Sequence, residues 1–381
     1  MPDWFDSGGP GLIRSAGQRG QNRTALRMLL DCLAQRRAIV SRAGAAVPIG
    51  MGRQAALVHC QTSGSGGVPK TVRRSQQSWI ASFQTNRSLF DLTPADCHAI
   101  LGEFGPSLPL YAATEALHLG CGLLALGGDG PRAQAGQMAG LGATVLYATP
   151  TQLRRLHGLT QPLPGIRLIL SGGGKLDPAC RDLVARLFPS AALHEFYGTA
   201  ETSFVSLSDA DTPPESVGRL YPGVSLDFGA DSRIRIASPY LFQGYDDAPA
   251  QDVLGADGRV CVGDTGRLDE CGQLYLHGRL GRMVTVADRN VFPEAIEDLM
   301  LALSGGRSCV ALTRPDARRG HAVLAVIEGA PDPALAETIR QSCRDRLGPH
   351  CVPRRVLFLP RIPTLASGKP DLTALAARLA P

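Results

Sequence analysis

The stretch from Thr62 to Lys70 holds the residue types that could bind an anion. It reads T-S-G-S-G-G-V-P-K, with three glycines, three hydroxyl side chains and one lysine in nine positions. Glycines let the backbone bend tightly and point several N–H groups into one concavity, and a lysine at its edge adds a full positive charge. A nucleotide phosphate suits such a site. The spacing matches neither G-x-x-x-x-G-K-S/T nor G-x-G-x-x-G, so a flexible surface turn with a chance lysine is the alternative.

Lysine is scarce in this sequence. Of the 39 Lys and Arg residues, the lysines are Lys70, Lys175 and Lys369. Arginine therefore supplies most of the positive charge, and the lysines indicate places that need a compact ammonium on a flexible stem. Lys369 also follows a glycine, in A-S-G-K-P. Compositional drift is the alternative explanation.

Composition limits the class of protein. A chain of 381 residues can form two or three domains, and 44% hydrophobic and 19% charged residues are ordinary for a soluble globular protein. The net charge of +5 comes without a basic run, so nucleic acid is not an expected partner. We expect no membrane span and, because the first twenty residues lack the order of a signal peptide, a cytoplasmic location.

The segments around these residues alternate between strand and helix. A short apolar run, Ile166 to Leu170, precedes Gly172 to Gly174, and Asp177 followed by proline starts a helix. The next strand, Ala192 to Phe196, leads into Tyr197. Since open α/β sheets bind ligands at the carboxyl ends of their strands, we expect Gly172–Gly174 and Tyr197 to lie together there.

The pattern changes after Gly278. About 100 residues of mixed strand and helix follow. We therefore expect an N-terminal domain of residues 1–277 and a C-terminal domain of residues 278–381. The predicted fold class is α/β, with a large N-terminal domain of parallel-rich sheets and helices and a small mobile α+β C-terminal domain.

Five stretches, in order, resemble the acyl-adenylate-forming superfamily, which includes acyl-CoA ligases, peptide-synthetase adenylation domains and luciferases. The first resembles the family's phosphate loop, T-S-G-S/T-S/T-G-x-P-K. The five stretches are Thr62–Lys70; Ser171–Gly174; Tyr197–Glu201; Gly263-Asp264 followed by Gly278-Arg279 and Pro293–Glu297; and Ser367–Lys369. One alone would be a weak signal, but five in the family's order, spanning roughly residues 60–375, make the resemblance specific.

The resemblance implies a two-step reaction. A carboxylate attacks the α-phosphate of ATP to give acyl-AMP and pyrophosphate, and a thiol then displaces AMP. Positioning and charge neutralisation would do most of the catalysis. The implied cofactors are ATP, Mg²⁺ and CoA or a phosphopantetheine carrier. The implied partners are a small carboxylic acid and CoA or an acyl or aryl carrier protein.

The resemblance also implies roles by motif position. The expected phosphate-loop residues are Thr62, Ser63, Gly64, Ser65, Gly66, Gly67 and Lys70. The expected adenine-side residues are Gly172, Gly173, Gly174, Tyr197, Gly198 and Thr199. Asp264 and Arg279 would bind the ribose, and Glu201 would hold Mg²⁺. Lys369 would bridge the acid and the α-phosphate, so Lys369, Glu201 and Lys70 are the expected catalytic residues. Each taken alone has an ordinary structural alternative, such as a turn aspartate or a strand-end core tyrosine.

Several positions depart from the family pattern. Fewer residues precede the phosphate loop than the family usually has, so a reduced first subdomain is expected. Ala200 stands where a threonine is usual, and Gly281 stands at the hinge. Asp288 replaces a glycine that lines the thiol channel, and Ala295 replaces the first glutamate of P-x-E-I/V-E. The departures at Gly281, Asp288 and Ala295 thus concern the thioester half of the reaction rather than the adenylation half.

The acid pocket is predicted from position alone. Pro106 or Tyr111 would form its gate, and His194, Phe196 and Phe204 are candidate walls or core residues. These residues favour a small or aromatic acid. The leading hypothesis is an ATP-dependent acyl-CoA ligase-like enzyme. The alternatives are a carrier-protein-loading acyl-AMP ligase, a non-catalytic nucleotide-binding relative and an unrelated nucleotide-binding α/β protein.

Overall fold

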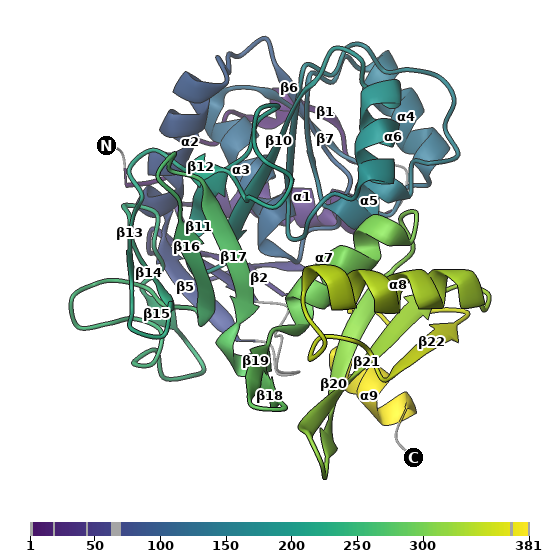
Figure 1. Ribbon diagram of the computed structural model, residues 1–381. Helices are drawn as coiled ribbons and strands as arrows, with labels where there is room; N and C mark the ends of the chain where they lie inside the picture. The colour runs from purple at the N-terminus through teal and green to yellow at the C-terminus, as the bar shows by residue number, and fades with distance from the viewer. Residues whose placement is uncertain (1–2, 18–19, 43–44, 62–69, 366–368, 380–381) are drawn as a thin grey trace.

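The computed structural model describes residues 3–17, 20–42, 45–61, 70–365 and 369–379. The chain folds into a large N-terminal part, purple to green in Figure 1, and a small C-terminal part, green to yellow, that lies against it. This arrangement confirms the predicted α/β fold class. Among the described residues, no helix is long and apolar enough to cross a membrane.

An eight-stranded sheet forms the centre of the large part. Its order is β1-β7-β6-β8-β9-β10-β11-β12, and the pairs from β1 to β10 are parallel, whereas β11 and β12 are antiparallel. The strands are β1 (Ile13–Ser15), β6 (Cys97–Ile100), β7 (Gly122–Ala125), β8 (Val145–Ala148), β9 (Leu168–Gly172), β10 (Ala192–Thr199), β11 (Ser203–Leu207) and β12 (Arg219–Leu220).

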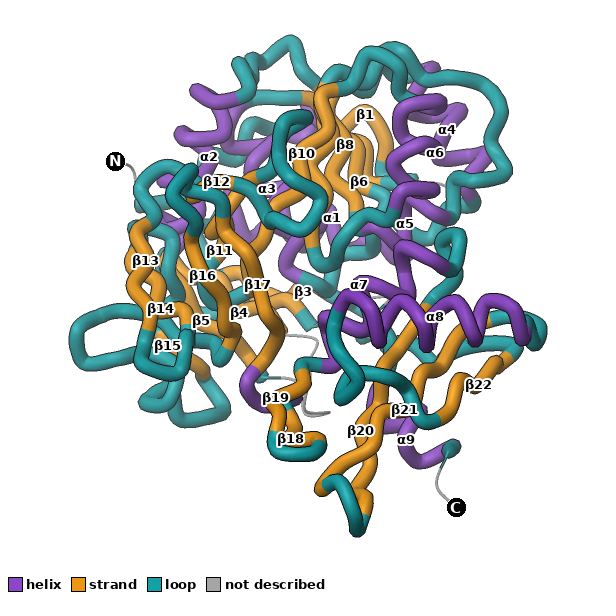
Figure 2. The backbone as a smooth tube through the Cα atoms, in the orientation of Figure 1, coloured by secondary structure: helices purple, strands orange, loops and turns teal. Residues whose placement is uncertain are grey.

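Helices cover both faces of this sheet, as Figure 2 shows. The helices on one face are α1 (Gly20–Ala34), α2 (Gln76–Leu89) and α3 (Ser107–Leu119), and those on the other are α4 (Pro131–Gly140), α5 (Pro150–Arg154) and α6 (Pro178–Leu187). Strands β6 to β9 are buried along their whole length because both faces are covered. The predicted helix start is confirmed, since Asp177 Oδ1 accepts a 3.0 Å hydrogen bond from the Cys180 amide.

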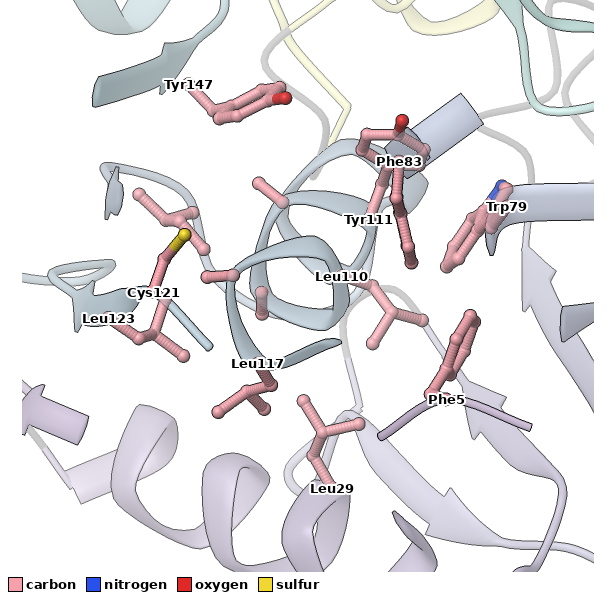
Figure 3. Close-up of a cluster of buried hydrophobic side chains, with 14 of the residues drawn as sticks. Phe5, Leu29, Trp79, Phe83, Leu110, Tyr111, Leu117, Cys121, Leu123 and Tyr147 are labelled. Atoms are coloured by element: carbon pink, nitrogen blue, oxygen red, sulfur yellow. The ribbon is translucent and has the colours of Figure 1, made fainter. Parts of the chain in front are cut away.

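The core on the α1–α3 face contains a group of large aromatic side chains. In Figure 3, Trp79 and Phe83 of α2 lie next to Tyr111 of α3. The ring centroids of Trp79 and Tyr111 lie 5.3 Å apart, and those of Phe83 and Tyr111 lie 5.0 Å apart. These edge-on contacts hold the Tyr111 ring of α3 against two rings of α2.

A second sheet of five strands includes the strands that precede and follow the phosphate-loop segment in the sequence. Its order is β15-β5-β4-β2-β3. The strands are β2 (Ile39–Ser41), β3 (Ile49–Met51), β4 (Leu57–Gln61), β5 (Thr71–Ser75) and β15 (Gly244–Tyr245). Two hairpins complete the large part: β13 (Ser225–Phe228) with β14 (Ile234–Ala237), and β16 (Asp264–Leu268) with β17 (Leu274–Arg279).

The small part packs helices on a five-stranded sheet. Its strands are β18 (Val284–Val286), β19 (Arg289–Val291), β20 (Cys309–Asp316), β21 (Gly320–Glu328) and β22 (Arg355–Leu359), and its helices are α7 (Pro293–Leu303), α8 (Pro333–Arg346) and α9 (Leu372–Arg378). Short 3₁₀ turns cover Pro10–Leu12 and Leu280–Arg282. A domain boundary near Gly278 remains our proposal; β17 ends beside it, and the turn Leu280–Arg282 follows.

Candidate active site

A cavity of about 1510 Å³ lies where the two parts meet. The predicted site residues that the structure describes all line it. They are Lys70, Gly172, Gly173, Gly174, Tyr197, Gly198, Thr199, Glu201, Asp264, Arg279 and Lys369. The other predicted site residues, namely Thr62, Ser63, Gly64, Ser65, Gly66 and Gly67, lie outside the described residues. Residues far apart in the sequence therefore meet at one site.

Parallel pairing of β9 and β10 places the glycine stretch beside Tyr197, as predicted, because Gly172 pairs with Phe196. A Cβ at Gly172 would lie 2.1 Å from Phe196 Cζ, so only glycine fits beneath that ring. Gly173 adopts φ +88°, which favours glycine. Position 172 thus has to be glycine because the Phe196 ring of the neighbouring strand leaves no room for a side chain. Position 173 favours glycine because the backbone turns there, at the edge of the cavity.

Asp264 is held between two other predicted site residues. Its Oδ2 accepts a 2.6 Å hydrogen bond from the Tyr197 hydroxyl, and its Oδ1 accepts a 3.0 Å bond from Arg279 Nε. Asp264 and Arg279 are also paired across β16 and β17, so the hairpin register sets their distance. Burial, reinforced by the charge of Asp264, raises the pKa of Tyr197 well above its usual range, so the phenol stays a hydrogen-bond donor.

Glu201 receives a partner that the sequence does not indicate. The Tyr245 hydroxyl donates a 2.9 Å hydrogen bond to Glu201 Oε1, and the Lys70 ammonium lies 4.9 Å from the centroid of the Tyr245 ring. Tyr245 is on β15, which pairs with β5, the strand that follows Lys70. Burial and then the Glu201 charge raise the pKa of Tyr245. Tyr245 thus connects Glu201 to Lys70, and nothing in its local sequence marks it.

Lys369 reaches the cavity from the C-terminal part. A Cβ placed on Gly173 would lie 3.9 Å from Lys369 Cε, so the lysine stem passes beside the glycine stretch. Burial lowers the pKa of the Lys369 ammonium, and the charge of Arg279 lowers it further, whereas Asp264 and Glu201 act in the opposite direction. Lys369 therefore shares one electrostatic environment with three of the predicted residues.

Two departures in the C-terminal part have a structural explanation. Ala287 and Asp288 form the two-residue turn between β18 and β19, with φ values of 49° and 61°. Both central residues have positive φ, as a type I′ turn requires, so Asp288 keeps the left-handed backbone that a glycine would adopt. Its side chain is exposed.

Ala295 leaves no gap in the acidic cluster of α7. Arg282, which the sequence analysis missed, pairs with Glu297 at 2.7 Å and with Glu294 at 3.1 Å. Glu294, one position before Ala295, and Glu297 thus supply the two carboxylates that contact this guanidinium. The position of Arg282, directly after the expected hinge residue Gly281, is the one sequence feature that could have pointed to its role.

Most of the predicted acid-pocket residues line the cavity. Pro106, Tyr111, Phe196 and Phe204 do so, and the Phe196 and Phe204 ring centroids lie 4.4 Å apart. His194 does not line it: its Nδ1 lies 2.7 Å from the Ser208 carbonyl and its ring lies 5.2 Å from that of Phe90. The His194 ring packs against Phe90 instead, although the next residue along β10, Glu195, does line the cavity.

Comparison with known proteins identifies the family. The family model described as AMP-binding enzyme matches residues 33–245, and the model described as AMP-binding enzyme C-terminal domain matches residues 295–369. The chain is 32% identical to an uncharacterized acyl–CoA ligase, YhfT, of Bacillus subtilis over 81% of its own length, and it spans 65% of the length of that relative.

Solved structures share the fold. An ATP-bound RpMatB–BxBclM chimera is 26% identical, with a TM-score of 0.72 over 84% of this chain and 68% of the chimera. The amide bond synthetase McbA of Marinactinospora thermotolerans is 25% identical, with a TM-score of 0.73 over 88% of this chain and 71% of McbA.

Proposed function

The chain belongs to the AMP-binding enzyme family, and on that premise we propose that it activates a small carboxylic acid with ATP, forming acyl-AMP, and then transfers the acyl group to a thiol. The observation that carries this proposal is the position of Lys369. Its side chain enters the cavity beside Gly173, within the electrostatic reach of Asp264, Glu201 and Arg279. A buried ammonium at that place suits two anions that must approach each other.

Lys369 would assist the attack of the acid carboxylate on the α-phosphate. The acid carboxylate and the α-phosphate repel each other, and an ammonium between them neutralises charge as the new bond forms. Burial has lowered the pKa of Lys369, so the incoming anions would stabilise its charged form. Lys70, at the end of the phosphate-loop segment, would neutralise the pyrophosphate that leaves.

Asp264 would bind the ribose. Each of its carboxylate oxygens already accepts one hydrogen bond, from Tyr197 or from Arg279. A carboxylate has about four lone-pair sites, so capacity remains for the ribose hydroxyls. The two protein donors would hold the carboxylate in place, and the Tyr197 ring would lie against adenine.

Glu201 is the residue that we propose would hold Mg²⁺. Glu201 lines the cavity, and the Tyr245 hydroxyl donates a hydrogen bond to Oε1 of its carboxylate. The other lone pairs of the carboxylate would be available to a metal ion. Carboxylate oxygen is a ligand that Mg²⁺ prefers, and one or two carboxylates usually suffice beside substrate phosphates and water. When bound, Mg²⁺ neutralises charge on the phosphate oxygens.

We propose a small or aromatic acid as the substrate. The wall beyond Phe196 is made of large rings, because Phe204 lies 5.4 Å from Tyr111 and Tyr111 lies 5.3 Å from Trp79 between ring centroids. All four of these side chains line the cavity. Flat apolar surfaces of this kind favour a compact or aromatic acid.

We propose CoA as the thiol, because the relative YhfT is named as an acyl–CoA ligase. A carrier protein bearing phosphopantetheine is the competing acceptor. Gly281, which lies in the turn Leu280–Arg282, is the proposed hinge about which the C-terminal part would rotate for this step. An enzyme that consumes ATP and CoA is expected where both are abundant, so we propose a cytoplasmic location.

Carboxylate-dependent exchange between ATP and pyrophosphate tests the proposal. We expect exchange with at least one member of a panel of short aliphatic and aromatic acids. CoA or a phosphopantetheinyl carrier protein, added in separate reactions, then identifies the thiol. If ATP binds and no acid supports exchange, the chain is instead a non-catalytic nucleotide-binding relative.

A further inference from the structure

Arg74 is a buried arginine at the edge of the proposed active site. It lies on β5, the strand that follows Lys70, lines the cavity and is only 1% exposed. Strand alternation turns Arg73 to the other face, where it is partly exposed and its Nη1 lies 3.5 Å from Asp246 Oδ1. Two adjacent arginines on one strand thus have opposite environments.

The hydrogen bonds of Arg74 go to Ser203, to the Glu201 backbone and to the Tyr240 backbone. Its Nη1 donates to the Ser203 hydroxyl, and its Nη2 donates to the carbonyl oxygens of Tyr240 at 3.1 Å and Glu201 at 3.3 Å. The guanidinium also lies 5.4 Å from the centroid of the Trp79 ring. Although burial lowers the pKa of Arg74 to about 10, the group remains charged at neutral pH.

The free-energy cost of burying a charge indicates that Arg74 has a role beyond packing. Moving a guanidinium out of water costs several kcal/mol, and all three of its hydrogen bonds end on uncharged oxygens. An apolar side chain beside Trp79 would avoid that cost. The Glu201 charge and the Trp79 ring offset part of the cost, and the three hydrogen bonds tie the guanidinium to the residues around Glu201.

What it holds is a tight turn between β10 and β11. Ser203 has φ 56°, a left-handed conformation that is uncommon for serine. A Cβ on Gly198 would lie 1.8 Å from the Ser203 carbonyl oxygen, so the two sides of the turn are in close contact. The Glu201 carbonyl also accepts a 2.8 Å hydrogen bond from the Phe242 amide. Arg74 and Phe242 together fix the Glu201 peptide.

We infer that Arg74 is a positioning residue that fixes the backbone of Glu201 relative to the strand that follows Lys70. The Glu201 carboxylate and the Lys70 ammonium then stay at a constant separation across the proposed phosphate site. The inference rests on the proposed function, in which Glu201 holds Mg²⁺. Arg74 itself does not touch the metal or the phosphates.

Calorimetric binding of nucleotide tests this role apart from turnover. The Arg74→Met variant should bind Mg·ATP about tenfold more weakly than the wild type, because loss of groups that orient a metal ligand typically costs 10–100-fold in affinity. Its affinity for ATP in EDTA should stay within about twofold. In the exchange assay, half-saturating Mg²⁺ should rise about tenfold at an unchanged KM for the acid.

Matched variants separate positioning from folding. Arg73→Met, on the same strand but the exposed face, should behave like the wild type in both assays. Ser203→Ala removes one acceptor and leaves the buried charge in place, so it should weaken Mg·ATP binding about threefold even if Arg74→Met does not fold.

Two results would overturn the inference. One is an Arg74→Met variant that folds and keeps the wild-type Mg²⁺ requirement; the other, if that variant does not fold, is a Ser203→Ala variant with wild-type affinity for Mg·ATP. Failure of the proposed function is distinguishable, because it would appear in the wild type as an absence of acid-dependent exchange.

Discussion

The ribose end and the catalytic-lysine end of the candidate site are built differently. Asp264, Tyr197 and Arg279 lie on strands whose register sets their positions, and their side chains bond to one another at 2.6 and 3.0 Å. Lys369 instead arrives on a loop of the C-terminal part, where its carbonyl accepts a 2.8 Å bond from the Leu365 amide. The first group is carried by strands of two sheets in the large part, whereas the position of Lys369 depends on where the C-terminal part lies.

Because of this difference, substitutions at the two ends should affect stability and catalysis to different extents. Removing a side chain at the ribose end leaves buried polar partners unpaired, so both folding and binding should suffer. Removing the ammonium of Lys369 takes away a buried charge that burial itself disfavours, as its lowered pKa indicates. Folding should then suffer little while chemistry suffers greatly.

Lys369→Ala should have the largest effect. Loss of a preorganised group that stabilises the transition state costs on the order of 10²–10³ in rate, so acid-dependent ATP–pyrophosphate exchange should fall by that factor or more. The unfolding midpoint should stay close to that of the wild type. Retention of full exchange would remove Lys369 from the proposed mechanism.

Asp264→Asn should affect both properties. The variant keeps the shape but loses the charge that pairs with Arg279, so we expect about 1–3 kcal/mol of lost stability in urea denaturation and a clearly raised KM for ATP. A variant that matched Lys369→Ala, with intact stability and lost exchange, would contradict the distinction between the two ends.

The pH dependence of exchange should show the environment of Lys369. The charged ammonium is the active form, and its pKa is lowered by burial and by Arg279. The alkaline fall in kcat/KM for ATP should therefore begin below the usual lysine range near pH 10.4. Arg279→Gln removes one of the lowering charges, so the alkaline limb should move to higher pH; a shift to lower pH would count against this assignment.

Lys175→Ala should have the smallest effect and serves as a control for Lys369→Ala. Lys175 follows the glycine stretch and lines the same cavity, and its Nζ lies 3.8 Å from Asp298 Oδ2 of α7. Both side chains are partly exposed, so the ion pair contributes about 0–1 kcal/mol. Exchange should stay within about twofold of the wild type. A tenfold loss would show that this contact is needed to hold the C-terminal part in place.

Much of the site was predictable because its signals are local. The sequence places a glycine stretch and Tyr197 at the ends of successive strands, and parallel pairing of those strands is enough to bring them together. For His194 the sequence left two possibilities, a pocket wall or a core residue, and the structure places its ring against Phe90, away from the cavity. The residue type alone could not decide between the two, because the packing partner Phe90 is more than 100 positions away in the sequence.

The sequence by itself determined the fold class, the family resemblance and the residues expected at the site, since each follows from short motifs and their order. Only the tertiary structure decided which partners hold those residues: Tyr245 on Glu201, Arg74 on the Glu201 backbone, and Arg282 on Glu294. The reason is physical. A hydrogen bond between distant positions depends on which strands pair and on which side chains are buried together, and no local pattern of residues carries that information.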